Sequence, residues 1–507
     1  MVRFFVRSLP VVGSIAAVFA VGVPLMMSNS SPASSATALQ GAPQGAPAPV
    51  LAPAGENWTM PKIVAQPTWG ARIQRSMKLM ASSTRSRRNR VKVLFYGQSI
   101  TQQDWTKTVA DDLRRRFPFT DFVFDNRAIG GFSSQLLVKT AEQDLYSFYP
   151  DLMIFHVYGS HSDYEKIIEN VRRRTTADIV MQTDHVTKAG DLTEETDPAK
   201  LAPNQWDAWM NHSFLPQTAR KFDVELADVR AGWKRHLQSE KLEPKLFLSD
   251  DVHLNNRGNA LMATLVSPYL RYDASLPVQH ANSVRDYPIG RILKWNKGRL
   301  KMTFSGNRVD VIADNNGKAV GAKAAGARAV GARVRVLIDG KSPSQTTGAM
   351  AFTRSSIGFS TWTPAITRFG SQALLVPETW TARITEISAD GKKFKYSVRG
   401  SVTGEDGSGD SDNTFVSNSK RVVIDPADWW LGFSKSPMPV GFEVTWQVVP
   451  QGVDIYQAPE IADKAIEYST TLAQGFANTS HTLELVALDK NPPPIAAIRV
   501  YEPPLKP

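Results

Sequence analysis

A serine, a histidine and an aspartate in this chain have the residue types and the order of a nucleophilic triad. Ser99 follows a Gly-Gln pair, and Asp250 precedes His253 by three positions far downstream. A serine hydroxyl attacks an acyl carbon efficiently only when a base takes its proton, and a carboxylate must orient that base. We therefore predict a catalytic set of Ser99, Asp250 and His253, with Asp251 as the competing carboxylate.

The segments that carry these residues alternate between short apolar runs and amphipathic helical stretches. Residues 91–96 form the first apolar run, and apolar side chains then recur every four positions from Trp105 to Phe117, as on one helix face. Similar apolar runs occupy residues 122–124, 152–158, 179–181 and 224–229. Alternating strands and helices predict an α/β fold with a parallel sheet covered on both faces. Ligands bind at the carboxyl ends of such strands, where Ser99 is expected.

The segments after the predicted strands resemble the motif blocks of SGNH, or GDSL, hydrolases. These segments are Gly97-Gln98-Ser99, Ile129-Gly130-Gly131-Phe132, Gly159-Ser160-His161-Ser162 and Asp250-Asp251-Val252-His253. Over about residues 91–270, the serine turn, the glycine and the Asp-x-x-His block match the family in order. The resemblance implies a flavodoxin-like three-layer sandwich and a serine esterase that needs no cofactor.

The same resemblance assigns the donors that stabilise the oxyanion formed during acyl transfer. These would be the backbone N–H groups of Ser99 and Gly131, with Gly130 as the alternate glycine. The asparagine that supplies the family's third donor is missing, and its place falls on His161 or, if the loop is one residue longer, on Ser162. Either side chain can donate a hydrogen bond, although neither reproduces an amide in a fixed orientation, and we predict His161.

The substrate expectation comes from Gln98, which stands where the family usually has aspartate. A Gly-Gln-Ser turn resembles that of some carbohydrate O-acetylesterases, so we expect an exported esterase that removes acetyl groups from a carbohydrate. A triad does not distinguish water from a sugar hydroxyl as the acceptor, which leaves a glycan O-acyltransferase as an alternative. A second alternative is a glycan-binding protein with impaired catalysis, because the third oxyanion donor of the family, an asparagine, is missing.

Composition excludes several other chemistries. The chain has 507 residues and no cysteine, which removes thiol nucleophiles, Cys-ligated zinc and iron–sulfur clusters. Several residues that could bind a metal lie near predicted strand ends, namely His156, His161, Asp163, Asp184 and His185. No pair of them has the spacing of a known metal site, so we predict no metal. His156 and His185 are expected in core or supporting positions. Trp105, Trp206 and Trp209 could line a sugar-stacking surface or belong to the core.

The net charge of +11 is concentrated in one segment, residues 72–92, which contains basic residues and no acidic ones. No aromatic ladder or nucleic-acid motif accompanies it, so we predict a solvated basic connector and no nucleic-acid partner.

The amino terminus carries Arg3 and Arg7 ahead of an apolar run at residues 9–27. Residues 1–30 are therefore predicted to be a signal peptide or membrane anchor, followed by a linker at residues 31–90. This predicts export to the periplasm, the cell envelope or the medium.

Two folded regions are expected after the linker. Residues 91–273 form the predicted hydrolase domain. Residues 285–507 are rich in short β-type runs and turn signals, which predicts an all-β, jelly-roll-like sandwich, with a probable insertion at residues 343–439. This region either binds glycan or is purely structural.

Overall fold

The computed structural model describes residues 60–201, 204–315, 331–346, 348–431 and 438–506. The predicted signal peptide or anchor and much of the predicted linker lie outside these residues. Within the described residues, no helix combines the length and the apolar character needed to cross a membrane.

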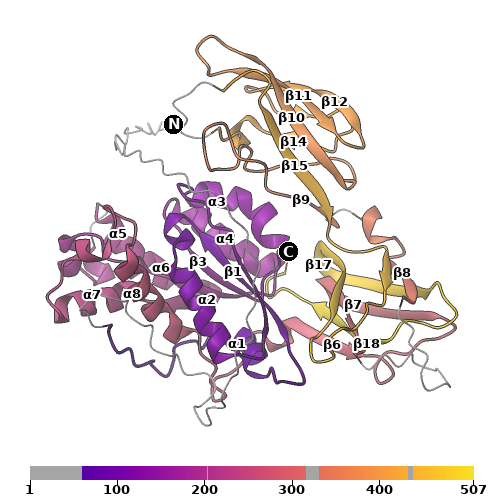
Figure 1. The fold of residues 1–507 in the computed structure, drawn as a ribbon, viewed down its shortest axis with the longest axis horizontal. Coiled ribbons are helices and arrows are strands. Elements are labelled where there is room, and N and C mark those ends of the chain that lie inside the picture. Colours follow the sequence, from indigo (N-terminus) through magenta and orange to yellow (C-terminus); the bar gives the residue numbers. More distant parts are fainter. Residues whose placement is uncertain (1–59, 202–203, 316–330, 347, 432–437, 507) are drawn as a thin grey trace, which may run out of the picture. The chain divides into compact units, whose positions relative to one another are not determined.

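A parallel sheet forms the centre of the first folded region (Figure 1). Its five strands lie in the order β2-β1-β3-β4-β5, and every neighbouring pair is parallel. The strands are β1 (Arg90–Gly97), β2 (Asp121–Asn126), β3 (Leu152–His156), β4 (Asp178–Gln182) and β5 (Glu225–Ala227). This strand order is that of flavodoxin-like folds, so the predicted α/β fold class is confirmed.

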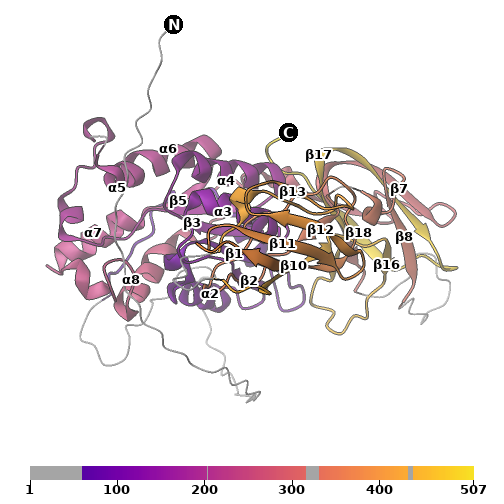
Figure 2. The same cartoon turned by 90° about the horizontal axis from the view of Figure 1, so that it is seen from above.

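Helices cover both faces of this sheet (Figure 2). Alternate residues of β1 point to opposite faces and pack into two different hydrophobic cores. Val93 and Phe95 pack in one core with α1 (Gln74–Ala81), α2 (Trp105–Arg116), α7 (Val229–Ser239) and α8 (Asn256–Val266). Leu94 and Tyr96 pack in the other with α3 (Ser134–Ala141), α4 (His161–Arg174) and α6 (Leu215–Phe222). The short α5 (Trp206–Trp209) lies in the connection between β4 and α6. The side-chain period of two along a strand thus gives a three-layer arrangement.

The prediction that residues 72–92 form a solvated basic connector is wrong for part of this segment. Helix α1 buries Met77 and Met80 in the core on one face of the parallel sheet. Arg75 is also buried, and its guanidinium donates to the carbonyl oxygens of Asp151 and Thr176. The apolar face of the helix and these carbonyl acceptors outweigh the cost of burying one arginine.

Antiparallel sheets make up the carboxy-terminal region, which confirms the predicted β-sandwich class. One sheet has six strands in the order β16-β8-β17-β7-β18-β6. They are β6 (Val284–Pro288), β7 (Arg299–Ala313), β8 (Arg333–Ile338), β16 (Ile455–Gln457), β17 (Ser469–Ala487) and β18 (Ile495–Tyr501). The other sheet has five strands in the order β12-β11-β10-β15-β9. Each sheet has its own hydrophobic core.

The five-stranded sheet is an insertion between β8 and β16. Its strands are β9 (Met350–Phe352), β10 (Glu378–Ile387), β11 (Phe394–Gly400), β12 (Gly404–Asp410) and β15 (Glu443–Pro450), and a small pair, β13 (Phe415–Val416) and β14 (Val423–Ile424), accompanies them. Because β15 pairs with β10 and β9, this sheet continues past residue 439, where the sequence placed its end. We refer to residues 343–450 as the inserted domain.

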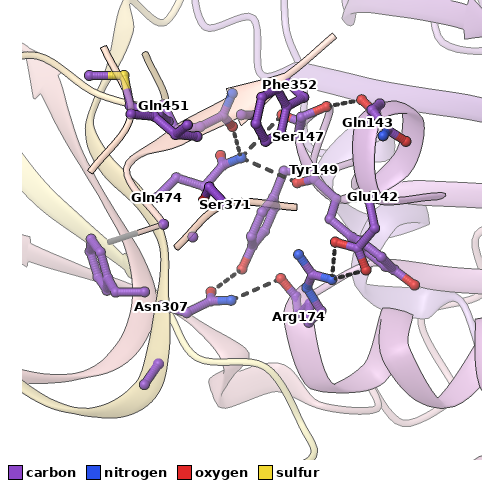
Figure 3. Close-up of a pocket in the computed structure, with 18 of the residues that line it drawn as sticks. Glu142, Gln143, Ser147, Tyr149, Arg174, Asn307, Phe352, Ser371, Gln451 and Gln474 are labelled. Carbon is purple, nitrogen blue, oxygen red and sulfur yellow. Dashed lines mark hydrogen bonds and ion pairs between the residues drawn. The ribbon is translucent and has the colours of Figure 1, made fainter. Parts of the chain in front are cut away.

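Hydrogen bonds join the six-stranded sheet to the hydrolase domain beside a cavity of about 500 Å³ (Figure 3). The Gln474 side-chain amide donates to the carbonyl oxygens of Tyr146 and Ser147, at 3.2 and 3.1 Å. The Tyr149 hydroxyl donates to Asn307 Oδ1 at 2.9 Å. These hydrogen bonds are buried or partly buried, so they hold the six-stranded sheet against a segment that is distant from it in sequence.

Candidate active site

Ser99 lies on a tight turn at the carboxyl end of β1. The strand ends at Gly97, and Ser99 begins a short 3-10 helix that runs to Gln102. A Cβ added at Gly97 would lie 2.3 Å from the carbonyl oxygen of His156 and 2.5 Å from Thr101 Oγ1, so only glycine fits there. The Trp105 indole N–H donates to the carbonyl oxygen of Ile100 at 2.6 Å and holds the turn from inside the core.

The structure brings the predicted triad side chains into one hydrogen-bonded chain. His253 Nε2 lies 2.9 Å from Ser99 Oγ, and His253 Nδ1 lies 2.7 Å from Asp250 Oδ2. The other oxygen of Asp250 accepts the backbone N–H groups of Val252 and His253, at 2.8 and 2.7 Å. In the described structure, Asp251 makes no hydrogen bond to the His253 ring, so Asp250 is the carboxylate in the orienting position.

Electrostatics keep Asp250 ionised. Burial raises the pKa of Asp250, but the backbone N–H groups of His253 and Val252 and the His253 ring outweigh it and hold that pKa below its usual range. An ionised carboxylate only accepts hydrogen bonds, so His253 Nδ1 must carry the proton and Nε2 is free to accept one from Ser99. The side chains of His253 and Asp250 are 40% and 57% exposed, so this site is open to solvent.

The loop that carries His253 is clamped to the serine turn and to the end of β4. The Gln103 side chain forms a reciprocal pair with Leu254, donating to its carbonyl oxygen at 2.9 Å and accepting its N–H at 3.0 Å. On the other side, His185 Nε2 donates to the carbonyl oxygen of Val252 at 2.8 Å. His185 is buried, as expected for a supporting residue, and the triad loop is its partner. Both contacts fix the backbone on either side of His253.

The predicted oxyanion loop passes directly beside Ser99. A Cβ added at Gly130 would lie 3.6 Å from Ser99 Cβ, which shows how closely this backbone approaches Ser99. Gly131 has φ +82°, a left-handed conformation that favours glycine, and no atom lies within 4 Å of the position its Cβ would take. Both glycines therefore have the close or unusual backbone that such a loop requires. Which N–H binds the oxyanion stays a prediction.

His161 packs among aromatic side chains at the first turn of α4. Its ring centroid lies 5.3 Å from Trp206, 4.8 Å from Trp209 and 4.4 Å from Phe214. Burial lowers the pKa of His161, which favours the neutral ring. Neither His161 nor Ser162 bonds to Ser99 or Gly131 in the described structure; Ser162 Oγ instead lies 3.0 Å from Ser160 Oγ. The third oxyanion donor therefore stays a prediction.

The histidines, aspartates and tryptophans that the sequence also offered as possible ligands or sugar-binding residues can be placed in the structure. His156 Nε2 bonds to Asp184 Oδ1 at 2.6 Å, and both side chains are buried. Burial raises the pKa of Asp184, but the charge and hydrogen bond of His156 outweigh it and lower that pKa. No group of three or more possible metal ligands occurs among the described residues. Trp105 is fully buried in the core and lines no surface, whereas Trp206 is 36% exposed.

Sequence reasoning missed two residues at this site, Gln103 and Trp362. Gln103 belongs to no motif, and only its pairing across 151 positions with Leu254 gives it a role. Trp362 lies in the inserted domain, yet its indole N–H donates to the carbonyl oxygen of Gly130 at 2.9 Å. No local pattern connects an inserted domain to the serine turn, so no sequence signal could have found this contact.

Comparisons with known proteins give structural likenesses only. No family model matches the chain, and no curated protein matches it. A crystal structure of a two-domain esterase active on acetylated mannans is 14% identical, with 85% of this chain and 95% of that chain covered and a TM-score of 0.33. An acetylxylan esterase from Geobacillus stearothermophilus is 16% identical over 36% of this chain and 95% of its own, with a TM-score of 0.31.

A GDSL-like lipase structure from Parabacteroides merdae is 17% identical over 36% of this chain and 98% of that chain, with a TM-score of 0.31.

Proposed function

We propose that this protein is an exported serine esterase of the SGNH type that hydrolyses acetyl esters on a carbohydrate. The observation that carries the proposal is the hydrogen-bonded chain from Ser99 Oγ through His253 to Asp250, at 2.9 and 2.7 Å. Its residues lie at the carboxyl edge of the parallel sheet, where this fold class places its ligands. The export part of the proposal rests on residues 1–30 of the sequence.

The geometry supports a two-step acyl transfer. Ser99 Oγ attacks the acetyl carbon while His253 Nε2 accepts its proton, and ionised Asp250 stabilises the resulting imidazolium. The oxyanion faces the backbone N–H groups of Ser99 and of Gly131 or Gly130. His253 then protonates the departing sugar oxygen, which leaves an acetyl group on Ser99. Water, activated by the same ring, attacks this acetyl-enzyme and releases acetate.

The solvent exposure of the triad side chains supports the proposal that the substrate is large. With the side chains of His253 and Asp250 about half exposed, a glycan can present an acetyl group without entering a closed pocket. The Gly-Gln-Ser turn supports the carbohydrate ester in particular, through its resemblance to O-acetylesterases.

Labelling and product analysis test the proposal. A serine-directed phosphonate should modify Ser99 in the wild-type protein but leave Ser99→Ala unmodified at that position, as mass spectrometry would show. The wild type should release free acetate from an acetylated oligosaccharide, and the folded Ser99→Ala variant should not. Unchanged acetate release by Ser99→Ala would refute the assignment of the nucleophile. Acetyl transfer to an added acceptor oligosaccharide, without free acetate, would identify an acyltransferase instead.

A further inference from the structure

Trp362 of the inserted domain stands beside the nucleophile with most of its surface uncovered. Its side chain is 65% exposed, although a large aromatic ring is normally at least partly buried. One edge is fixed, because the indole N–H donates to the carbonyl oxygen of Gly130 at 2.9 Å. Gly130 in turn lies against Ser99, since its Cβ position would be 3.6 Å from Ser99 Cβ. The remainder of the ring therefore faces solvent next to the serine.

A short, hydrogen-bonded turn presents this ring. The backbone N–H of Gly358 donates to the carbonyl oxygen of Thr363 at 2.9 Å, and Ile357 forms a β-bridge with Pro364. The hydroxyls of Thr361 and Thr363 lie 2.9 Å apart. Because these bonds close the turn on both sides of Trp362, the ring is held in place before any ligand arrives, which lowers the entropy cost of binding.

The inserted domain is also attached to the hydrolase domain on either side of the oxyanion loop. Arg354 forms a bidentate ion pair with buried Asp144, at 3.0 and 2.7 Å, and donates to the carbonyl oxygen of Arg127 at 2.9 Å. At the other end, the Trp430 ring packs edge-on against Phe132, with centroids 5.7 Å apart. These contacts flank Gly130, so the position of Trp362 beside Ser99 is set by several independent interactions.

We propose that Trp362 is a substrate-binding residue whose exposed indole face stacks against a sugar ring of the acylated glycan. This rests on the proposed function, because it places the sugar next to the ester that Ser99 attacks. An aromatic face matches the apolar C–H face of a pyranose, whereas the edge that bonds to Gly130 remains occupied. A further tryptophan, Trp206, is 36% exposed and stacks on Tyr158, which follows β3 at the same edge of the sheet.

Steady-state kinetics on two substrates test this role. With an acetylated oligosaccharide, Trp362→Ala should lower kcat/KM about tenfold, mainly through KM, since stacking contributes to binding before the chemical step. With 4-nitrophenyl acetate, which has no sugar ring, the loss should be at least fivefold smaller. Trp362→Phe keeps an aromatic face but loses the N–H donor, so it should retain most of the oligosaccharide activity. Val402→Ala, at an exposed apolar residue of the same inserted domain, is the matched control.

The outcomes separate a binding surface from a structural contact. Equal losses in Trp362→Phe and Trp362→Ala would show that the hydrogen bond to Gly130 matters rather than the ring face, and would overturn the proposal. Equal losses on both substrates would overturn it too. A calorimetric titration of the oligosaccharide into Ser99→Ala and Ser99→Ala/Trp362→Ala provides a readout without catalysis. Weaker binding by the double variant supports the role of Trp362 even if Ser99 proves not to be the nucleophile.

Discussion

At the scale of single residues, Asp250 performs two tasks at once. One carboxylate oxygen binds His253 Nδ1, and the other accepts backbone N–H groups of its own loop. Asp251 is adjacent in sequence but does not share these contacts in the described structure. Orientation of the imidazole and shape of the loop therefore depend on the same side chain.

Asparagine substitutions at the two adjacent aspartates should have very different effects. Asp250→Asn removes the charge that stabilises the imidazolium and allows the wrong histidine tautomer, so kcat on 4-nitrophenyl acetate should fall by about a thousandfold or more. Asp251→Asn, the matched control, should stay within about threefold of the wild type. Circular dichroism would verify folding of both variants. A larger effect at Asp251 would transfer the orienting role to that residue.

At the scale of elements, the serine turn and the histidine loop are positioned relative to each other by Gln103. Its amide both donates to and accepts from the backbone of Leu254, the residue after His253. The amide therefore constrains the distance between Ser99 Oγ and His253 Nε2, across which the proposed proton transfer would take place.

Gln103→Ala should lower kcat about tenfold with little change in KM, because two hydrogen bonds of roughly 1 kcal/mol each hold the geometry of the base rather than the substrate. The rate of phosphonate labelling at Ser99 should fall in parallel. Gln238→Ala, which removes an exposed side chain on α7, serves as the control. A normal labelling rate in Gln103→Ala would show that the loop keeps its position without this pair.

Another connection between elements ties the segment after β4 to α7. Glu194 forms a bidentate ion pair with Arg230, at 2.6 Å for both contacts, and Arg230 also donates to the carbonyl oxygen of His185. Burial raises the pKa of Glu194, but the hydrogen bonds from Arg230 and His212 outweigh it and lower the pKa to about 2. The network therefore supports the residue that holds Val252.

This pKa shift predicts a pH-dependent contribution to stability. A carboxyl whose pKa is lower in the folded state stabilises the fold wherever it is ionised, so Glu194 should contribute fully above about pH 4.5 and progressively less as the pH falls toward 2. The contribution is about 3 kcal/mol at neutral pH. In urea unfolding, Glu194→Gln should be much less stable than the wild type at pH 7 and closer to it at pH 3. An identical difference at both values would contradict the shift.

At the scale of the whole molecule, the inserted domain is held by a charged pair whose acid is almost fully buried. Burial raises the pKa of Asp144 and outweighs the opposing effect of Arg354, so the carboxylate is costly unless Arg354 stays bound. The inserted domain and the hydrolase domain are coupled through this pair as well as through Trp362.

Removing Arg354 should therefore destabilise the protein more than removing both charges. Arg354→Ala leaves Asp144 buried without its guanidinium partner and should cost roughly 3 kcal/mol in unfolding free energy. Arg354→Ala/Asp144→Asn should recover part of this loss, because no unpaired charge remains. Urea denaturation of the two variants and the wild type measures the difference. A double variant as unstable as the single one would mean that Arg354 acts through the carbonyl oxygen of Arg127 instead.

Local sequence patterns were enough to predict the α/β core and to identify the candidate site residues. Apolar runs and four-residue periodicity are local signals, so the strands and helices of the parallel sheet could be predicted from them. Motif order identified Ser99, Asp250 and His253, because triad chemistry requires these side chains whatever the surrounding fold. The Asp-x-x-His spacing favoured Asp250 over Asp251, and the structure places Asp250 Oδ2 2.7 Å from His253 Nδ1.

Other features depend on contacts between segments that are distant in sequence, and local patterns could not predict them. Helix α1 joins the core because Met77 and Met80 find apolar partners there, although its charge pattern is typical of a solvated connector. His161 packs among aromatic rings supplied by α5 and the segment that follows it, which motif spacing alone could not show. Trp362 reaches Gly130 across 232 positions, since the fold brings an inserted domain to the serine turn and no local sequence pattern encodes that approach.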